Sequence, residues 1–389
     1  MAKLIDIIGK VLSGEWGTDD ETGDGIPVLR TTNFTNEGVV NYNDVVTRII
    51  TKKNIEEKYL RKGDIIIEKS GGSDKFPVGR VIYFDGEENT YLFNNFTGLL
   101  RVKDQEIWYP RYVFYSLFAN YKRGGTRAFE NKTTGLHNLK IDDYVSRYEV
   151  AEIGVTEQVL ICDKLDKLYE IIKLREQELQ LLDELIRARF VEMFGDININ
   201  DKHWECEPLG ELCTIVRGSS PRPIEQFLGG DVPWIKIGDA TDGDNIYLSS
   251  TKEHIIQEGV KKSRLVKAGS LIFANCGVSL GFARIITFDG CIHDGWLAME
   301  DIDEKLDKIF LLQALNQMTE HFRAIAPAGT QPNLNTAIMK AYKQVIPPIE
   351  LQRDFIWFVN QVNKSKVAVQ KALDETQILF DSLMQEYFG

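Results

Sequence analysis

Ile153-Gly-Val-Thr-Glu-Gln158 and Pro347-Pro-Ile-Glu-Leu-Gln352 open two stretches of this chain that end alike, in Met193-Phe-Gly195 and Tyr387-Phe-Gly389. A shift of 194 residues aligns the two stretches without a gap, so that Gln158 falls on Gln352. Few residues are identical, but the apolar positions coincide. A segment that recurs at a fixed offset indicates a duplicated architecture, and this repeat decides the fold.

The apolar residues of each stretch recur in steps of three and four, which is the spacing of one face of an α-helix. At about 1.5 Å per residue, each stretch predicts a coiled-coil-like helix of roughly 35 residues, about 50 Å long. Gly195 is a natural end of the first helix, and Pro347-Pro348 is a natural boundary before the second. The periodic residues are Ile161, Leu165, Leu168, Ile172, Leu179, Leu182, Ile186 and Met193, and then Phe355, Val359, Val362, Val369, Leu373, Phe380, Leu383 and Tyr387.

The segments that precede the two helices also repeat, at slightly different offsets. They are short β-rich runs separated by glycines, which predicts globular domains made mostly of strands and turns. Additional helices are expected at Tyr109 to Tyr121 and at Lys308 to Phe322. The matched runs are Pro27-Val-Leu-Arg30 with Pro233-Trp-Ile-Lys236, Leu60 to Ile67 with Val266 to Phe273, and Arg80-Val-Ile-Tyr-Phe84 with Arg284-Ile-Ile-Thr-Phe288.

We therefore predict an α+β fold in which two β-rich domains are joined by two long helices, duplicated about a pseudo-two-fold axis. The expected segments are a first domain at 1–150, a first helix at 151–195, a second domain at 196–346 and a second helix at 347–389. A chain of 389 residues also exceeds the usual size of one hydrophobic core, so two domains are the natural expectation.

Composition narrows the possible functions. The chain has no apolar run of membrane-spanning length, and Asp6 and Gly9 interrupt what would be the core of a signal peptide, so a cytoplasmic protein is expected. Five cysteines without a C-x-x-C pair argue against a disulfide framework and against a zinc ribbon. No phosphate-binding loop or catalytic constellation is present, and neither a catalytic residue nor a metal site is predicted.

Two pairs of polar loops stand at equivalent places in the two domains. Glu68 to Ser73 and Ala274 to Ser279 each follow a strand, and their glycines allow the backbone to approach a ligand closely. Lys122 to Asn138 and Gly329 to Leu334 precede the long helices. Lys, Asn and Ser are suited to phosphate oxygens and base edges, so the loops favour DNA binding. A net charge of −12 then requires basic side chains to gather on one face, or a partner to supply them.

The doubled order of these features resembles the specificity subunit of type I restriction-modification enzymes. No single motif is specific, but the likeness covers essentially the whole chain. The residues that carry it are Leu4-Ile-Asp-Ile and Leu209-Gly-Glu-Leu, the runs at 27, 63, 233 and 269, Gln331-Pro-Asn-Leu-Asn335, Ile346-Pro-Pro-Ile349 with Gln352, and the Phe-Gly helix ends.

The resemblance implies that each domain is a target-recognition domain that reads one half of a bipartite site in double-stranded DNA. It implies that the helices pack antiparallel as a spacer and dock two methyltransferase subunits, which in turn recruit restriction and translocase subunits. S-adenosylmethionine, Mg and ATP are then expected only in those partners, and no cofactor is expected in this chain. Two alternatives remain: the recognition subunit of a related two-part restriction enzyme, or a coiled-coil scaffold that binds no DNA.

Resemblance and residue chemistry together select ten candidate DNA-binding residues. The first domain departs from the pattern because Leu136-His-Asn138 stands where the second has Gln331-Pro-Asn333. The candidates are Arg30, Lys69, Ser70, Arg127 and Asn131 in the first domain, and Lys236, Asn275, Ser279, Thr330 and Gln331 in the second.

Overall fold

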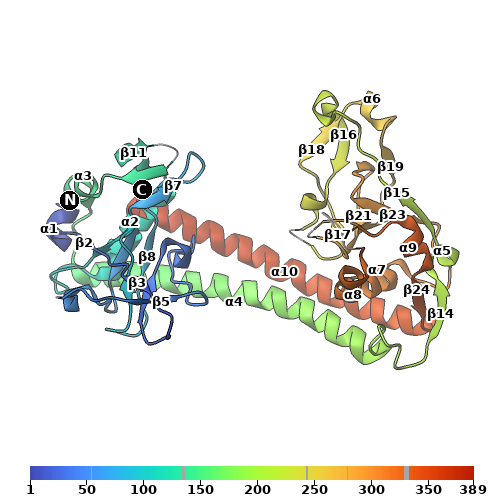
Figure 1. Cartoon of the computed structure of the whole chain (residues 1–389), viewed down its shortest axis with the longest axis horizontal. Helices are drawn as coiled ribbons and strands as arrows, with labels where there is room; N and C mark the ends of the chain where they lie inside the picture. The colour runs from blue at the N-terminus through green and yellow to red at the C-terminus, as the bar shows by residue number, and fades with distance from the viewer. Residues whose placement is uncertain (54, 134–135, 242–243, 278, 328–332) are drawn as a thin grey trace. The chain divides into compact units, whose positions relative to one another are not determined.

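The computed structural model describes residues 1–53, 55–133, 136–241, 244–277, 279–327 and 333–389. They form two compact units, Met1–Arg175 with Ala372–Gly389, and Glu176–Lys371. Each unit contains one globular domain together with one half of each long helix (Figure 1). Among the described residues, no helix is both long enough and apolar enough to cross a membrane.

The first unit combines several small sheets with a largely buried helix, α2. Its elements are β1 (Ala2–Lys3), α1 (Leu4–Ile8), β2 (Leu12–Ser13), β3 (Thr18–Asp19), β4 (Ile26–Leu29), β5 (Val46–Ile49), β6 (Ile65–Glu68), β7 (Ser70–Gly72), β8 (Val81–Tyr83), β9 (Leu92–Phe93), β10 (Thr97–Leu100), α2 (Pro110–Lys122), β11 (Glu130–Thr133), β12 (Leu136–Leu139), α3 (Ile141–Arg147), β13 (Glu149–Val150) and the first part of α4 (Val155–Phe194).

The second unit repeats much of this order. Its elements are β14 (Glu205–Pro208), α5 (Leu209–Leu212), β15 (Thr214–Arg217), β16 (Leu228–Ile235), β17 (Tyr247–Leu248), β18 (Glu253–Ile255), α6 (Gln257–Val260), β19 (Arg264–Val266), β20 (Leu271–Ala274), β21 (Ala283–Ile286), β22 (Gly290–Ile292), β23 (Trp296–Glu300), α7 (Lys308–Gln317), α8 (Thr319–Ile325), α9 (Thr336–Ala341), β24 (Lys343–Ile346) and the first part of α10 (Ile349–Phe388).

The sheets confirm the duplication. One sheet has the order β2-β10-β6-β8 in the first unit and β15-β23-β20-β21-β17 in the second. In a further sheet, β4 pairs in parallel with β9, and β16 pairs in parallel with β22 at the same register. A two-stranded sheet joins the beginning of each domain to its end, β1 with β13 and β14 with β24. The two domains therefore share one scaffold.

The central strands are apolar on both faces. The β-branched run Ile65-Ile66-Ile67 favours a strand, and all three side chains are fully buried. Ile65 and Ile67 pack on the core that contains α2 and the helix ends, whereas Ile66 packs on the opposite face with Leu29 and Phe93. Burial on both sides explains why this run shows no alternation with polar residues.

The structure corrects one match from the sequence repeat. Ile66 pairs with Ile82 in the first unit, and the equivalent Ile272 pairs with Arg284 in the second. Arg284 therefore occupies the place of Ile82, and the alignment of Arg80 with Arg284 was wrong by two residues. A two-residue shift preserves the alternation of faces along a strand, so the apolar pattern cannot reveal it.

The long helices pair antiparallel within each unit, as expected. In the first unit, Ile161 and Leu165 of α4 share a core with Phe380 and Met384 near the end of α10. In the second unit, the end of α4 shares a core with the beginning of α10, where the Phe190 and Phe355 rings meet at 5.4 Å. Gly195 follows α4 with a φ of 75°, the left-handed conformation that commonly ends a helix.

Gln158 and Gln352 make the same three contacts in the two units. Both side chains are fully buried. Gln158 accepts a hydrogen bond from the Tyr109 N–H and donates to the carbonyls of Ile107 and Ile153. Gln352 accepts from the Asp307 N–H and donates to the carbonyls of Lys305 and Pro347. Each glutamine thus fastens the start of a long helix to the start of a helix in its domain.

The two additional helices lie where the sequence predicts helix, with one difference. Pro110 occupies the first turn of α2, where a missing N–H is tolerated. The expected helix from Lys308 to Phe322 is divided into α7 and α8 at Met318. Side-chain bonds accompany the division: Asn316 accepts from the Ala283 N–H, and the Thr319 hydroxyl donates to the Gly281 carbonyl.

Candidate nucleic-acid interface

Four separate segments of the second unit meet at one end of its central sheet. The Asn275 N–H donates to the Gly295 carbonyl, and the Leu334 N–H donates to the Asn275 carbonyl. The Ser219 N–H donates to the Ile292 carbonyl in the same way. The ends of β15, β20 and β22 are thereby joined to the segment before α9. We call this place the four-loop site of the second unit.

The first unit builds the same site. The Lys69 N–H donates to the Phe96 carbonyl, the Leu139 N–H donates to the Lys69 carbonyl, and the Glu15 N–H donates to the Phe93 carbonyl. Ser70 pairs with Asn138 where Cys276 pairs with Asn333 in the second unit. By these bonds, Lys69 is the equivalent of Asn275 in the duplicated scaffold, and Asn138 is the equivalent of Asn333. The scaffold is common to the two sites, and the side chains differ.

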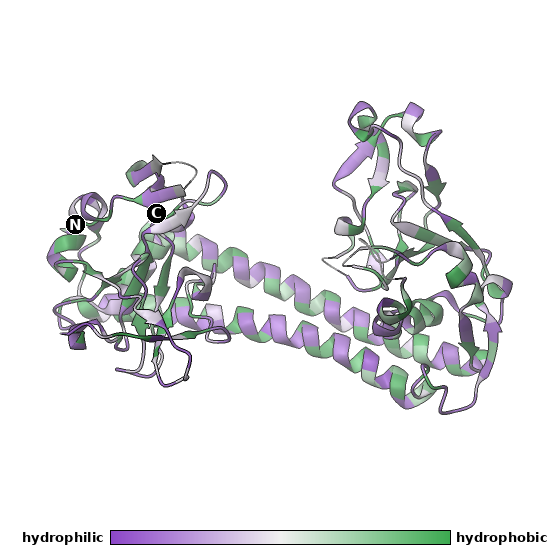
Figure 2. Cartoon of the chain, in the orientation of Figure 1, coloured by the Kyte–Doolittle hydropathy of each residue, from purple (hydrophilic) through white to green (hydrophobic). Residues whose placement is uncertain are grey.

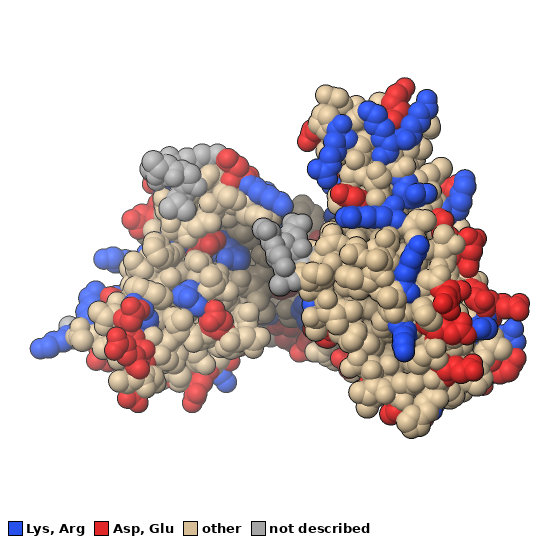
Figure 3. All heavy atoms as spheres, turned by 45° about the vertical axis from the view of Figure 1, so that its right-hand side comes forward, with Lys and Arg blue, Asp and Glu red and all other residues tan. Residues whose placement is uncertain are grey.

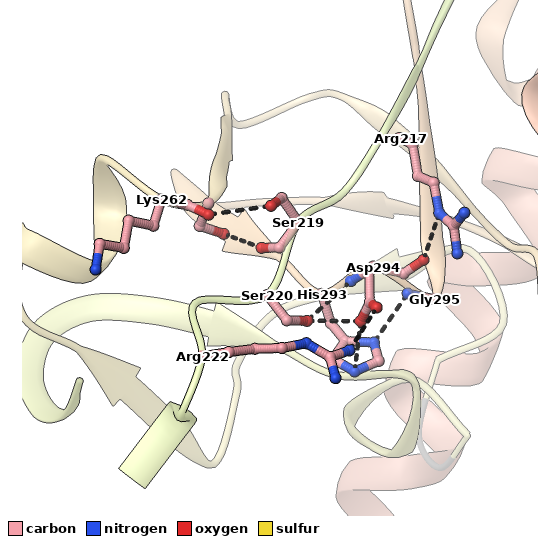
Figure 4. Close-up of polar contacts among 9 residues, drawn as sticks. Arg217, Ser219, Ser220, Arg222, Lys262, His293, Asp294 and Gly295 are labelled. Atoms are coloured by element: carbon pink, nitrogen blue, oxygen red, sulfur yellow. Dashed lines mark hydrogen bonds and ion pairs between the residues drawn. The ribbon is translucent and has the colours of Figure 1, made fainter. Parts of the chain in front are cut away.

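A cluster of polar side chains covers the four-loop site of the second unit (Figure 4). Asp294 lies at its centre and accepts hydrogen bonds from the Ser220 hydroxyl at 2.6 Å and from Arg222 Nη2 at 3.2 Å. The Arg217 Nε donates to the Asp294 carbonyl at 3.0 Å. We call Arg217, Ser219, Ser220, Arg222, His293 and Asp294 the second-unit polar cluster. Lys262 only accepts a hydrogen bond from the Ser219 hydroxyl through its backbone carbonyl, and its ammonium group points away from Asp294 (Figure 4).

The electrostatics of this cluster favour an ionised Asp294. Burial alone would raise the pKa of the carboxyl group, but the Ser220 hydrogen bond and the charges of His293 and Arg222 hold it below the usual value. Burial lowers the pKa of His293, partly opposed by Asp294, so the ring is mostly neutral at pH 7. An acceptor beside exposed cationic groups can contact both base edges and phosphates.

Close backbone packing holds the cluster in place. A Cβ atom at Gly218 would lie 2.1 Å from the carbonyl oxygen of His293, so only glycine fits there. The equivalent Gly14 of the first unit has the same restriction, since a Cβ would lie 2.1 Å from the Phe93 carbonyl oxygen. Both sites therefore rest on two loops in direct backbone contact.

Basic side chains gather over the second unit near this cluster. Figure 3 shows Lys and Arg concentrated over the part of the unit that carries β16, β18 and α6 in Figure 1. Arg222 has a side-chain exposure of 79%, which leaves its guanidinium available to a ligand. The exposed basic residues of this region are Arg217, Arg222, Lys252, Lys261, Lys262, Arg264 and Lys267.

The net negative charge lies mainly elsewhere. Residues 151–211, which include α4 and the segment after it, contain 15 acidic and 7 basic residues. That is the larger part of the net charge of −12. Residues 1–150 and 212–346 are close to neutral, so the overall charge does not oppose DNA binding by the loops within them.

Arg30 and Lys236 occupy equivalent positions but already have ionic partners. Each begins a short 3-10 helix directly after a strand. Arg30 Nη2 donates to an Asp44 carboxylate oxygen at 3.0 Å, and Lys236 pairs with Glu253 at 2.5 Å. Among the described residues, neither side chain forms a hydrogen bond or an ion pair with the four-loop residues, and either would have to exchange its partner to bind a phosphate.

Ser70 and Asn131 are brought together by a three-stranded sheet of order β11-β12-β7. Asn131 pairs with Asn138, and Asn138 pairs with Ser70, so the three side chains share a face. Lys69 lies next to this sheet and donates from Nζ to the Ser13 hydroxyl at 2.6 Å. Burial lowers the pKa of its ammonium group. The sequence selected three residues that are neighbours in space.

Arg127 serves the same region by a different contact. Its side chain is exposed and donates from Nη2 to the carbonyls of Asp74 and Lys75, at 3.2 and 3.3 Å. It therefore supports the loop between β7 and β8. In the neighbouring strands β12 and β11, His137 Nδ1 and a carboxylate oxygen of Glu130 lie 2.9 Å apart. Glu130 also accepts a hydrogen bond from the Val78 N–H of that loop.

The candidate DNA-binding residues in the loops of the second unit differ in how accessible they are to a ligand. Asn275 is fully buried, and its Nδ2 donates to the Asn333 side chain and to the Leu334 carbonyl. In this conformation it holds the loop before α9 and offers no surface to a ligand. Ser279 is half-buried in the turn after β20. Thr330 and Gln331 lie outside the described residues.

Sequence reasoning did not select the second-unit polar cluster. Arg217 ends β15 and Ser220 and Arg222 follow it, whereas Asp294 belongs to a loop far away in the chain. The only available signal was the pair of glycines, Gly14 and Gly218, at the ends of equivalent strands. Within the described residues, no group of three or more His, Cys, Asp or Glu side chains is arranged to hold a metal ion.

Comparison with solved structures supports the fold. The S subunit of a type I restriction-modification system from M. genitalium gives a TM-score of 0.57 at 18% identity, covering 100% of this chain and 95% of that one. A chain from a study of assembly and conformational transition in a type I R-M system gives 0.60 at 14% identity, with coverages of 100% and 96%. Both likenesses show the fold.

Comparison of sequences identifies the family. The specificity subunit of the type I restriction enzyme MjaIX from Methanocaldococcus jannaschii is 24% identical over 175 residues, and the match spans 43% of this chain and 40% of that subunit. The family model described as type I restriction modification DNA specificity domain matches twice, at residues 3–184 and 201–376. Because these two matches cover most of the sequence, the chain belongs to the family of type I restriction-modification DNA specificity domains and carries two of them.

Proposed function

We propose that this chain is the DNA sequence-recognition subunit of a type I restriction-modification complex and that each domain reads one half of a bipartite site. The duplicated four-loop site is the observation that carries the proposal. Two sites on one scaffold, with different side chains, are what an asymmetric split target requires. The subunit itself is non-catalytic and binds no cofactor; S-adenosylmethionine, Mg and ATP belong to its partners.

The equivalent residues of the two sites differ in hydrogen-bonding character. Lys69 of the first unit offers only donors, whereas Asn275 in its place is buried and supports a loop. Ser13 stands where the second unit has Arg217. Because base edges are distinguished by their donors and acceptors, such differences give the two domains different preferred bases.

Substitution of Arg222 by alanine is expected to relax specificity in one half-site only. Discrimination at the affected base pair should fall by about 10- to 100-fold, since a base contact is worth roughly 1–3 kcal/mol. The measurement is long-read mapping of modified adenines after co-expression with the methyltransferase subunit. An equal loss across all sequences would instead assign Arg222 to phosphate binding. Lys343→Ala, which removes an exposed cation of β24 outside this basic region, is the control and should leave the specificity unchanged.

We further propose that the domains are organised as the segments 1–150, 151–195, 196–346 and 347–389, with the helical segments acting as a spacer. Continuous helices α4 and α10 of 40 residues each support this role. Each residue added to or removed from a helix changes the length of the helix by about 1.5 Å.

Removing seven residues from the middle of both helices should shorten the preferred gap between half-sites by about three base pairs. Seven residues correspond to about 10 Å of helix, and a base pair rises about 3.4 Å. Deleting a whole heptad keeps the packing register. The same modification mapping gives the gap directly. A gap of unchanged length would contradict the spacer role.

The helices are also proposed to dock two methyltransferase subunits, through which restriction and translocase subunits join the complex in the cytoplasm. Apolar side chains that the antiparallel pairing leaves exposed support this role. On α4, five of them fall within an arc of roughly 80° at about 100° per residue. They are Leu160, Ile171, Leu174, Leu181 and Leu185, exposed by 39% to 63%. Figure 2 shows such hydrophobic positions among hydrophilic ones along both helices.

A further inference from the structure

A pocket of about 410 Å³ lies within the second unit, between α4, the segment that leads into β17, β21 and the helices α7 and α8. It is separate from the four-loop site, since it shares no lining residue with the second-unit polar cluster. A volume of this size is within the range of small-molecule sites in proteins. Its polar lining includes Asp183, Arg187, Asn245, Arg284, Gln313 and Asn316.

Arg284 is the unusual residue of this pocket. Its side chain is 8% exposed and stands on a strand position that the first unit fills with the apolar Ile82. The guanidinium lies over the Phe282 ring at 4.8 Å. Its Nη1 donates to the Ala283 carbonyl, its Nη2 donates to the Asn245 side chain at 3.3 Å, and its buried Nε has no hydrogen-bond partner.

The nearby carboxylates are engaged by other groups. Asp183 accepts from Lys366 Nζ at 2.8 Å through one oxygen and from the Asn245 amide through the other. Glu320 accepts from Arg323 at 2.8 Å. Within the described part of the chain, Arg284 has no ion pair of its own. Leaving a buried charge without a partner is costly, which indicates that a ligand completes the site.

The pKa of Arg284 agrees with this geometry. Burial lowers the pKa of the guanidinium to about 10, although Asp244 and Asp183 partly oppose the shift. The local negative charge therefore does not compensate for the loss of hydration. Arg187, which is exposed, adds a second cation to the lining of the pocket.

We propose that this pocket binds the phosphate group of a small phosphorylated molecule, with Arg284 as the principal ligand-binding residue. Nε and Nη2 form one edge of the guanidinium, which matches two oxygens of a phosphate. Because Nε is buried in the structure without a partner, phosphate binding includes a turn of the Arg284 side chain that brings this edge to the pocket. The pocket is larger than a phosphate ion, and the amide groups of Gln313 and Asn316 offer donors and acceptors to the remainder of the ligand.

The first unit supplies the matched variant for a test. Arg284→Ile places in the second unit the residue type that the same scaffold holds at Ile82. Removal of an uncompensated buried charge should leave the fold at least as stable as the original. If this variant nevertheless fails to fold, Arg284→Lys keeps the charge but cannot donate from two nitrogens on one edge.

Isothermal titration of the full chain with inorganic phosphate, at constant ionic strength, tests the site. We expect a dissociation constant in the millimolar range or tighter, weakened at least tenfold by Arg284→Ile or Arg284→Lys. Lys343→Gln, which removes an exposed cation of β24 that belongs to neither site, should leave phosphate binding unchanged. Absence of binding to the original chain, equal binding by the Arg284 variants, or loss in Lys343→Gln would overturn the proposal. None of these outcomes depends on DNA recognition.

Discussion

Replacement of Gln352 by leucine is expected to destabilise the second unit by about 3–5 kcal/mol. The change removes three hydrogen bonds and leaves the Asp307 N–H and two carbonyls without partners at a buried joint. Each unsatisfied buried polar group costs roughly 1–3 kcal/mol. Gln158→Leu should have a similar effect on the first unit, because its contacts are the same.

Hydrogen exchange measured under native conditions can assign each loss to its unit, and denaturant unfolding gives its size. Gln177→Leu is the matched control, since Gln177 is an exposed glutamine of α4 in the second unit. The control should change stability by less than about 0.5 kcal/mol. A Gln352→Leu protein within 1 kcal/mol of the original would show that the buried amide is not needed at this joint.

The double substitution Leu174→Asp and Leu181→Asp is expected to weaken binding of a methyltransferase subunit by more than about 100-fold. Both side chains are more than 60% exposed, so the change should leave the fold intact. If they are buried in the assembly, two carboxylates would be desolvated without partners, at a cost of several kcal/mol.

Co-purification and titration of the methyltransferase subunit would measure this effect. Glu184→Lys alters the charge of α4 outside the apolar arc and should affect binding by less than threefold. Equal binding by the leucine variants would place the docking surface elsewhere. Loss of binding together with a loss of helix content would indicate misfolding, which circular dichroism detects.

The fold was predictable because its strongest features are periodic. The steps of three and four around Leu165 and Val359 specify long helices, and their common offset specifies the duplication. The position of Arg284 was not predictable in this way. The run Arg284-Ile-Ile is similar in sequence to Arg80-Val-Ile. Only the hydrogen-bonded register of the strands shows that the two runs are offset by two residues.

Fewer residues of the candidate site could be predicted from the sequence. Lys69, Ser70 and Asn131 were selected from loop composition, and the structure places them together. Asn275 was selected on the same grounds, but its side chain is buried beneath the loop that it supports. The contact of Arg217 with Asp294 joins residues that are distant in the chain, and no local sequence pattern predicts such a contact.

The two-stranded sheets at the domain boundaries have an evolutionary consequence. Ala2 pairs with Val150, and Glu205 pairs with Ile346, so each domain enters and leaves the scaffold through one pair of adjacent strands. A stretch of gene that encodes everything between such strands can be replaced by recombination while the helices stay as they are. New combinations of half-sites would then arise by exchange of whole domains, without stepwise mutation of individual contacts.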